Sequence, residues 1–145
     1  MRLDEIIKGA VETILPRASA AEASAVMARA RVRHLVVLGR SHKIVGVLSS
    51  HDLRRAEPDS TVEDLMSAPA ITLPAGADVQ DAAKVLRLRN VGCLPLLDRG
   101  RLVGIVTASD LLALLGKGAL RVQAKTRKWT MPKRGPTHRP EPRRP

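Results

Sequence analysis

The stretch that decides the fold is Gly104-Ile105-Val106-Thr107-Ala108-Ser109-Asp110-Leu111-Leu112-Ala113-Leu114-Leu115. A short apolar run is followed by polar residues and then by leucines at helical spacing, which predicts a strand, a tight turn and an amphipathic helix. Thr107 and Asp110 have the spacing of a helix-capping box. The same pattern occurs earlier in the chain as Gly46-Val47-Leu48-Ser49-Ser50-His51-Asp52-Leu53. The repeated turn indicates an internal duplication.

The duplication extends over most of the chain at a nearly constant offset. Leu15-Pro16 corresponds to Leu73-Pro74, and the apolar run Val32–Leu38 corresponds to Val91–Leu97. The near-constant offset indicates that the two copies differ only by single-residue insertions in loops. We expect each copy to form a small, mostly three-stranded sheet with helices, which is an α/β or α+β class of fold.

These motifs resemble a tandem pair of cystathionine-beta-synthase (CBS) domains, also called a Bateman module. The resemblance rests on the Leu-Pro pairs, on the strand Val-Gly-Cys-Leu-Pro-Leu-Leu at Val91–Leu97, and on the repeated Gly-apolar-apolar-Thr/Ser-x-x-Asp-Leu turn. Val36 departs from the family pattern, because the second copy has the usual proline, Pro95, at this place. The resemblance implies two pseudo-symmetric repeats, which we place at residues 1–60 and 61–116.

Local signals predict where several helices begin. Residues 2–9, with the apolar Leu3, are expected to form a short helix that packs on the first repeat. Ser19 is expected to cap a helix over residues 20–31, and Asp78 a helix that ends near residue 89. A short helix is expected over residues 61–66, and another from Ser109 to about Gly116.

The charge of the chain is unevenly distributed. Residues 1–116 hold 15 Lys/Arg against 13 Asp/Glu, whereas residues 117–145 hold 10 Lys/Arg against one Glu, which together give the net charge of +11. We call residues 117–145 the tail. The prolines, high charge and low apolar content of this segment predict that it is disordered. Two interpretations of the tail stay open: a solvated segment without a partner, or an arm for nucleic acid or an acidic protein, with Trp129 free to stack on a base.

Three features of the sequence bear on the cellular location of the protein. Cys93 is the only cysteine, so no internal disulfide can form, which fits a reducing compartment. With two acids in the first five residues and no long apolar region there, we expect no signal peptide, and the apolar runs are too short to span a membrane. We expect a cytoplasmic protein without a membrane partner.

The repeated turn has a structural and a functional interpretation. As helix caps, Ser49 and Thr107 would each satisfy a free N–H group, and Asp52 and Asp110 would face the positive end of the helix dipole. As a nucleotide site, the same helix starts would offer N–H groups to a phosphate, and the carboxylates would accept hydrogen bonds from a ribose. The cap interpretation holds whether or not the functional one does.

The resemblance assigns ligand contacts to particular residues. In the family, the aspartate of the turn contacts ribose and the nearby Ser/Thr contacts ribose or phosphate, which implies Ser49 and Asp52 in the first repeat and Thr107, Ser109 and Asp110 in the second. Basic residues in the second strand, just before Leu35-Val36-Val37, reach the phosphates in nucleotide-binding relatives. Arg33 and His34 stand at that point, and the second copy has uncharged residues there. We therefore expect the Asp52 site to bind phosphate better than the Asp110 site; the alternative is that Arg33 and His34 are surface residues on an edge strand.

Nothing in the sequence predicts catalysis. No His, Cys, Asp and Glu residues cluster at metal-ligand spacing, and no nucleophile elbow or phosphate-binding loop occurs. The first hypothesis is a stand-alone regulatory protein, without a required cofactor, that binds AMP, ADP, ATP or S-adenosylmethionine between the repeats and signals to a partner. The alternative is a ligand-free dimeric interaction module whose tail binds nucleic acid or an acidic protein. The resemblance also implies a homodimer.

Overall fold

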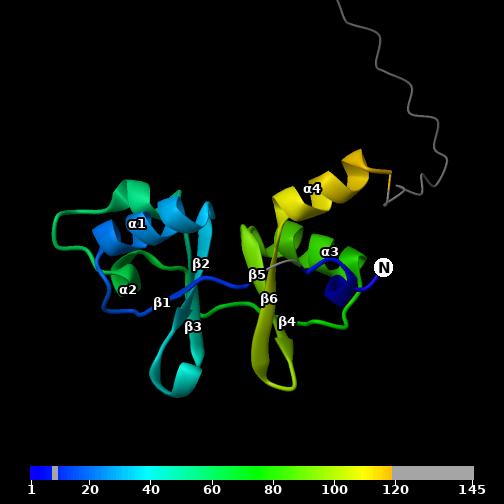
Figure 1. The fold of residues 1–145 in the computed structure, drawn as a ribbon, viewed down its shortest axis with the longest axis horizontal. Helices are drawn as coiled ribbons and strands as arrows, with labels where there is room; N and C mark the ends of the chain where they lie inside the picture. The colour runs from blue at the N-terminus through cyan, green and yellow to red at the C-terminus, as the bar shows by residue number, and fades with distance from the viewer. Residues whose placement is uncertain (8–9, 119–145) are drawn as a thin grey trace, which may run out of the picture.

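A computed structural model describes residues 1–7 and 10–118 of the chain. It shows two lobes side by side, each a three-stranded sheet with helices packed against it (Figure 1). This arrangement confirms the mixed α/β class expected from the duplication. The expected disorder of the basic tail, residues 117–145, and its possible partners concern a segment that from residue 119 on lies outside the described part of the chain.

The first lobe contains a sheet of order β1-β2-β3, in which β1 runs parallel to β2 and β2 runs antiparallel to β3. The strand β2 is therefore central. The elements of the first lobe are β1 (Thr13–Ile14), α1 (Ala20–Ala30), β2 (His34–Leu38), the 3-10 helix η2 (Arg40–His42), β3 (Ile44–Ser49), the 3-10 helix η3 (Asp52–Arg55) and α2 (Val62–Leu65).

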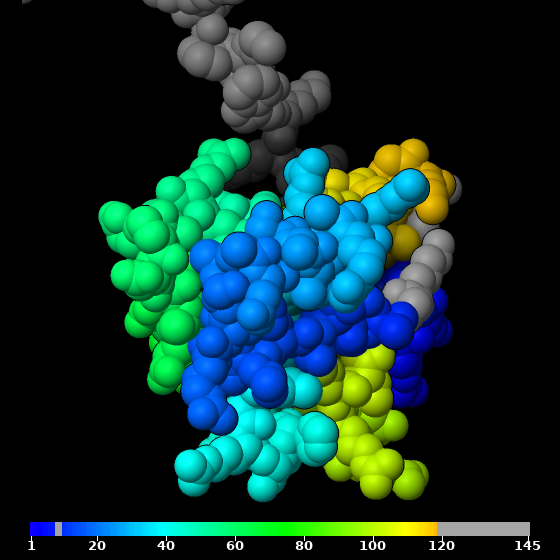
Figure 2. All heavy atoms as spheres, turned by 60° about the vertical axis from the view of Figure 1, so that its left-hand side comes forward, coloured from blue at the N-terminus to red at the C-terminus, as the bar shows by residue number. Residues whose placement is uncertain are grey.

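The second lobe repeats this topology with the sheet order β4-β5-β6. Here too the short first strand pairs in parallel and the hairpin pairs antiparallel. Its elements are β4 (Leu73–Pro74), α3 (Val79–Arg89), β5 (Cys93–Asp98), β6 (Arg101–Thr107) and α4 (Ala108–Gly116). The tips of the two hairpins lie side by side at one end of the molecule (Figure 2).

Capping residues fix where the long helices begin and end. The Ser19 hydroxyl accepts a hydrogen bond from the backbone N–H of Glu22 at 3.0 Å, and the Asp78 carboxylate accepts one from Gln80 at 2.8 Å, so both predicted caps are confirmed. Arg31 and Asn90 end α1 and α3 in the left-handed conformation. The turn after each helix includes two more residues before the next strand begins. The strands β2 and β5 therefore begin at His34 and Cys93, two residues after the start of the apolar runs at Val32 and Val91.

The N-terminal segment packs on the second repeat, so the expectation that it packs on the first repeat is wrong. Its 3-10 helix η1 (Leu3–Glu5) places the fully buried Leu3 in the core of the second lobe, among residues that include Val79 and Leu94. The backbone N–H of Leu3 donates to the carbonyl of Ala77 at 2.8 Å. The apolar pattern of this segment identified its buried side chain but carried no information on which of two similar cores would receive it.

The segment around α2 makes contacts in the first lobe that are equivalent to those of the N-terminal segment in the second lobe. Val62 is fully buried in that core, and its backbone N–H donates to the carbonyl of Ala18 at 2.9 Å. The offset between Leu3 and Val62 is that of the duplication, so the two residues occupy equivalent positions of the repeats. Each repeat thus begins with a segment that completes the core of the other lobe.

Two glycines in the hairpins allow these opening segments to lie close to the sheets. A Cβ atom at Gly104 would come within 2.8 Å of the Ile7 side chain, and one at Gly46 would come within 2.7 Å of the Met66 sulfur. Both contacts are too short for any larger residue without movement of the neighbour. Equivalent glycines therefore serve equivalent close approaches in the two lobes.

Each lobe has its own aliphatic core. The buried residues of the first lobe include Leu35 and Leu48, and those of the second include Leu96 and Val106. Among the described residues, no helix has the length and apolar character needed to cross a membrane.

Leu3→Ala should destabilise the protein by about 2–5 kcal/mol, because it removes a fully buried side chain and leaves a cavity in the second lobe. Denaturant unfolding monitored by circular dichroism measures the change. The matched control is Leu88→Ala in the same lobe, whose exposed side chain should change stability by less than about 0.5 kcal/mol. Equal effects of the two substitutions would contradict the contribution of η1 to this core.

Candidate functional site

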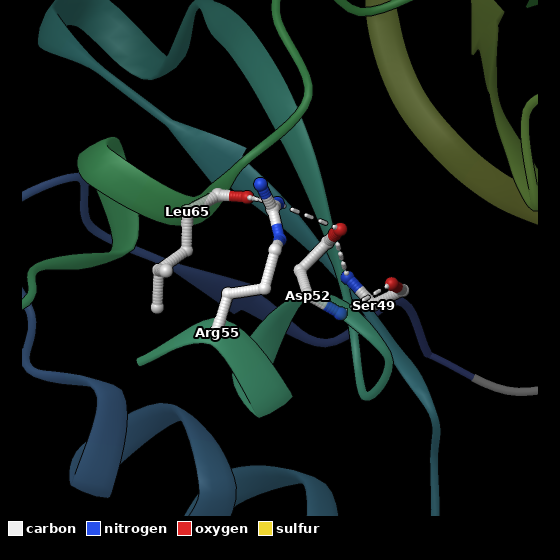
Figure 3. A network of polar contacts seen from close by, with 4 residues as sticks. All are labelled: Ser49, Asp52, Arg55 and Leu65. Atoms are coloured by element: carbon white, nitrogen blue, oxygen red, sulfur yellow. Dashed lines mark hydrogen bonds and ion pairs between the residues drawn. The ribbon is translucent and has the colours of Figure 1, made fainter. Parts of the chain in front are cut away.

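The two strand-to-helix turns have the same internal hydrogen bonds. In the first turn, the backbone N–H of Ser49 donates to the Asp52 carboxylate at 2.8 Å, and the backbone N–H of Asp52 donates to the Ser49 hydroxyl at 3.1 Å (Figure 3). Thr107 and Asp110 make the equivalent pair of bonds at 2.8 and 3.2 Å. The cap interpretation is thus confirmed for Thr107, the N-cap of α4, whereas the N-cap of η3 is His51 and Ser49 lies two residues before it. In both turns the hydroxyl and the carboxylate are held by the same pair of hydrogen bonds.

The two aspartates differ in what else they contact. The Arg55 guanidinium lies 3.4 Å from the second carboxylate oxygen of Asp52 and also donates to the carbonyl of Leu65 at 3.2 Å (Figure 3). The Asp52 side chain is only 15% exposed. In the second repeat, Ala113 stands at the position equivalent to Arg55. Asp110 is exposed, and its second oxygen has no hydrogen-bond partner among the described residues.

One cleft, which we call the Asp110 cleft, lies between the lobes and has a volume of about 600 Å³. The second repeat contributes Thr107, Ser109 and Asp110 to its wall. The first repeat contributes Arg31 and Arg33, which precede β2, and His34, the first residue of β2. The residues that line the cleft are Ile6, Ala10, Val11, Glu12, Arg31, Val32, Arg33, His34, Ile105, Thr107, Ser109 and Asp110.

A second cleft, the Asp52 cleft, has a volume of about 550 Å³. Ser49 and Asp52 lie in its wall, together with the uncharged residues before β5. Both volumes are within the range of small-molecule sites. The residues that line the Asp52 cleft are Arg33, His34, Val47, Ser49, Ser50, His51, Asp52, Ser67, Asn90, Val91, Gly92, Cys93 and Ser109.

The structure brings all seven candidate residues of the sequence into these two clefts, and three of them line both. Arg33, His34 and Ser109 are the shared residues. The expectation of stronger phosphate binding at Asp52 placed Arg33 and His34 in that site; both residues also line the Asp110 cleft, and the relative affinity of the two sites stays a prediction. The alternative, surface residues on an edge strand, is wrong about the strand, because β2 is central in its sheet, but Arg33, which precedes β2, is exposed.

Burial and nearby charges shift the pKa of two groups that line the clefts, His34 and Cys93. Burial lowers the pKa of His34 from its ordinary value near 6.5; the carboxylates of Asp52 and Asp110 oppose this shift, and Arg33 adds to it. The imidazole is therefore neutral at pH 7. Burial raises the pKa of the Cys93 thiol to about 12, so the thiol stays protonated and is a poor nucleophile.

Arg31, Glu12 and Arg55 contribute to the site but were not predicted from the sequence. Arg55 could have been found, because it stands three residues after Asp52, the spacing at which helical side chains pair. Arg31 and Glu12 had no such signal, because only the packing of the lobes brings them near Asp110. Within residues 1–7 and 10–118, no three His, Cys, Asp or Glu side chains lie close enough together to bind a metal ion.

Comparison with known proteins identifies the family. The profile of the CBS domain matches residues 3–59 and 62–117. The chain belongs to the CBS domain family. It is 34% identical over 112 residues to inosine-5'-monophosphate dehydrogenase of Thermoplasma acidophilum, a match that covers 77% of this chain and 23% of the enzyme. The CBS pair thus spans about a quarter of that curated relative.

Three further similar proteins carry the CBS domain in their names. A CBS domain-containing protein of Dictyostelium discoideum is 35% identical over 103 residues, which cover 59% of this chain and 71% of that protein. The CBS domain pair of protein MJ0100, solved in complex with 5'-methylthioadenosine and S-adenosyl-L-methionine, has a TM-score of 0.76 and 26% identity, over 81% of this chain and 98% of that one. The CBS domain protein PAE2072 from Pyrobaculum aerophilum, complexed with AMP, has a TM-score of 0.71 and 25% identity, over 82% and 98%.

The lowered pKa of His34 predicts how stability depends on pH. Because the unfolded chain takes up a proton near pH 6.5 and the folded protein only at lower pH, the wild type should lose stability relative to His34→Gln as the pH falls from 7 through 6.5. Denaturant unfolding of both proteins at pH 7.5, 6.5 and 5.5 measures this difference, with His42→Gln as a parallel variant at an exposed position. A difference that grows in favour of the wild type at low pH would contradict the burial of His34.

Proposed function

We propose that this CBS pair is a regulatory module, not an enzyme, and that it binds an adenosine-containing ligand in the Asp110 cleft. The observation that carries the proposal is the pairing of an exposed, fixed carboxylate with a basic stretch across the cleft. Within the described part of the chain, Asp110 has an oxygen free to accept hydrogen bonds, and Arg31, Arg33 and His34 line the facing wall.

The chemistry of an adenosine phosphate fits this arrangement. Ribose hydroxyls would donate to the Asp110 carboxylate, and the Ser109 hydroxyl would contact ribose or phosphate. The guanidinium groups of Arg31 and Arg33 would bind the phosphate, with support from the free N–H groups at the start of α4. The aliphatic side chains of Val32 and Ile105 offer apolar surface to the adenine.

The solved relatives support the ligand class, since MJ0100 was captured with two adenosine derivatives and PAE2072 with AMP. Ligand in a cleft between two lobes would favour the lobe arrangement that binds it best, and a partner would respond to that arrangement. No cofactor is required by such a mechanism. The cytoplasmic location expected from the sequence suits a sensor of nucleotides.

The Asp52 cleft is the second choice in this proposal, in contrast to the ranking made from the sequence. A ribose there would have to share the Asp52 carboxylate with Arg55. Its facing wall also has Asn90, Val91 and Gly92 where the Asp110 cleft has Arg31, Val32 and Arg33.

Homodimerisation is a further part of the proposal. Leu112 and Leu115, one turn apart on α4, are 66% and 40% exposed. A second copy of the chain would cover them. Binding of nucleic acid or of an acidic protein by the tail stays a prediction from its charge alone.

Isothermal titration with AMP tests the ligand proposal. Asp110→Ala should weaken AMP binding by about tenfold to a hundredfold, the effect of losing hydrogen bonds to a charged group. The matched variant, Asp52→Ala, should leave the tightest AMP site within about threefold of wild type, since that carboxylate lies outside the Asp110 cleft. If Asp52→Ala removes the tightest site and Asp110→Ala does not, the assignment of the cleft is wrong.

A further inference from the structure

Three residues stand on the boundary between the two clefts. Arg33, His34 and Ser109 line the Asp110 cleft and the Asp52 cleft alike. His34 is also close enough to Asp52 and Asp110 for both carboxylates to affect its protonation. The two clefts are therefore neighbours that use the same side chains.

The second repeat supplies no basic side chain of its own at this boundary. Gly92 stands at the position of the second repeat that is equivalent to Arg33. A Cβ atom on Gly92 would lie 2.9 Å from Nε2 of His34, so the imidazole occupies the space that a side chain at residue 92 would need. Gly92 is not among the glycines with a positive φ, which indicates that room for His34, not backbone conformation, requires it.

The Asp52 cleft consequently depends on the first repeat for its positive charge. Arg33 is the only Arg or Lys among its lining residues, whereas the Asp110 cleft has both Arg31 and Arg33. Arg33 is exposed and makes no ion pair among the described residues, so its guanidinium is available to either cleft. A single guanidinium cannot give its best hydrogen-bond geometry to two phosphates at once.

We propose that the two clefts share one phosphate-binding wall, formed by Arg33 and His34, so that a phosphate-bearing ligand in one cleft weakens binding of a second one in the other. This inference rests on the proposed function, because it requires both clefts to accept adenosine ligands. It adds a statement about how the two clefts are filled together. The chain binds one anionic ligand readily, and once one cleft holds it, the other cleft binds an uncharged adenosine ligand better than a second anionic one. Competition for the wall and repulsion between the phosphates act in the same direction.

The first test measures which cleft each arginine serves. AMP is titrated into full-length Asp52→Ala, which reports the Asp110 cleft, and into Asp110→Ala, which reports the Asp52 cleft. Adding Arg33→Ala should weaken AMP binding in both backgrounds by about fivefold or more. Arg31→Ala should weaken it more in Asp52→Ala than in Asp110→Ala. Arg29→Ala, on α1 and lining neither cleft, is the matched control for loss of one positive charge.

The second test measures the coupling. In the wild type, the second AMP should bind at least about fivefold more weakly than AMP binds to the Asp52 cleft of Asp110→Ala, where the neighbouring site is disabled. Uncharged adenosine should show no such difference. Using the variant as the reference separates coupling from any intrinsic difference between the clefts.

Each outcome bears on a specific claim. If Arg33→Ala weakens only one cleft, if adenosine couples as strongly as AMP, or if the Asp52 cleft binds no AMP in Asp110→Ala, the shared wall is overturned while the Asp110 site stands. If neither AMP nor adenosine binds the wild type, the proposed function fails, and the shared wall fails with it. Weakening in both clefts together with coupling specific to AMP supports the inference.

Discussion

The structure depends on the exchange of opening segments between the two repeats. Leu3 is buried in the lobe built by the second half of the chain, and Val62 is buried in the lobe built by the first half. Their backbone N–H groups donate to loops of those lobes, so apolar burial and hydrogen bonding act together. Because each lobe needs a segment of the other repeat, the lobes are held side by side, and the two clefts form where their walls meet.

A few side chains distinguish two clefts that share one backbone plan. Arg55 lies against Asp52, whereas the equivalent Ala113 has no group that could pair with Asp110. Arg33 lines both clefts, whereas the equivalent residue of the second repeat is Gly92. None of these differences changes the turn that fixes the aspartates, since both turns keep the same pair of reciprocal hydrogen bonds. The fold therefore supplies two equivalent frameworks, and the side chains decide what each can bind.

The sequence predicted what is local and repeated. The caps at Ser19 and Asp78, the two reciprocal turns and the three-stranded sheets follow from spacing and apolar pattern, which act over a few residues. It could not predict which lobe receives Leu3, because the pattern records burial but not the partner. The sequence could not show for the same reason that the two sites share side chains: Arg33 and His34 belong to the first repeat, yet the packing of the lobes places them in both clefts.

The exchanged segments also bear on how such a chain could have arisen. A polypeptide with only one copy of the repeat would have an opening segment whose buried leucine or valine has no lobe to enter, and a lobe whose core lacks that side chain. Two such polypeptides would complete each other by swapping their segments, which is a low-cost route to a dimer. Duplication and fusion would make the swap intramolecular, so that its completion no longer depends on protein concentration. The pseudo-symmetry of the present chain is the geometry expected of such an ancestor.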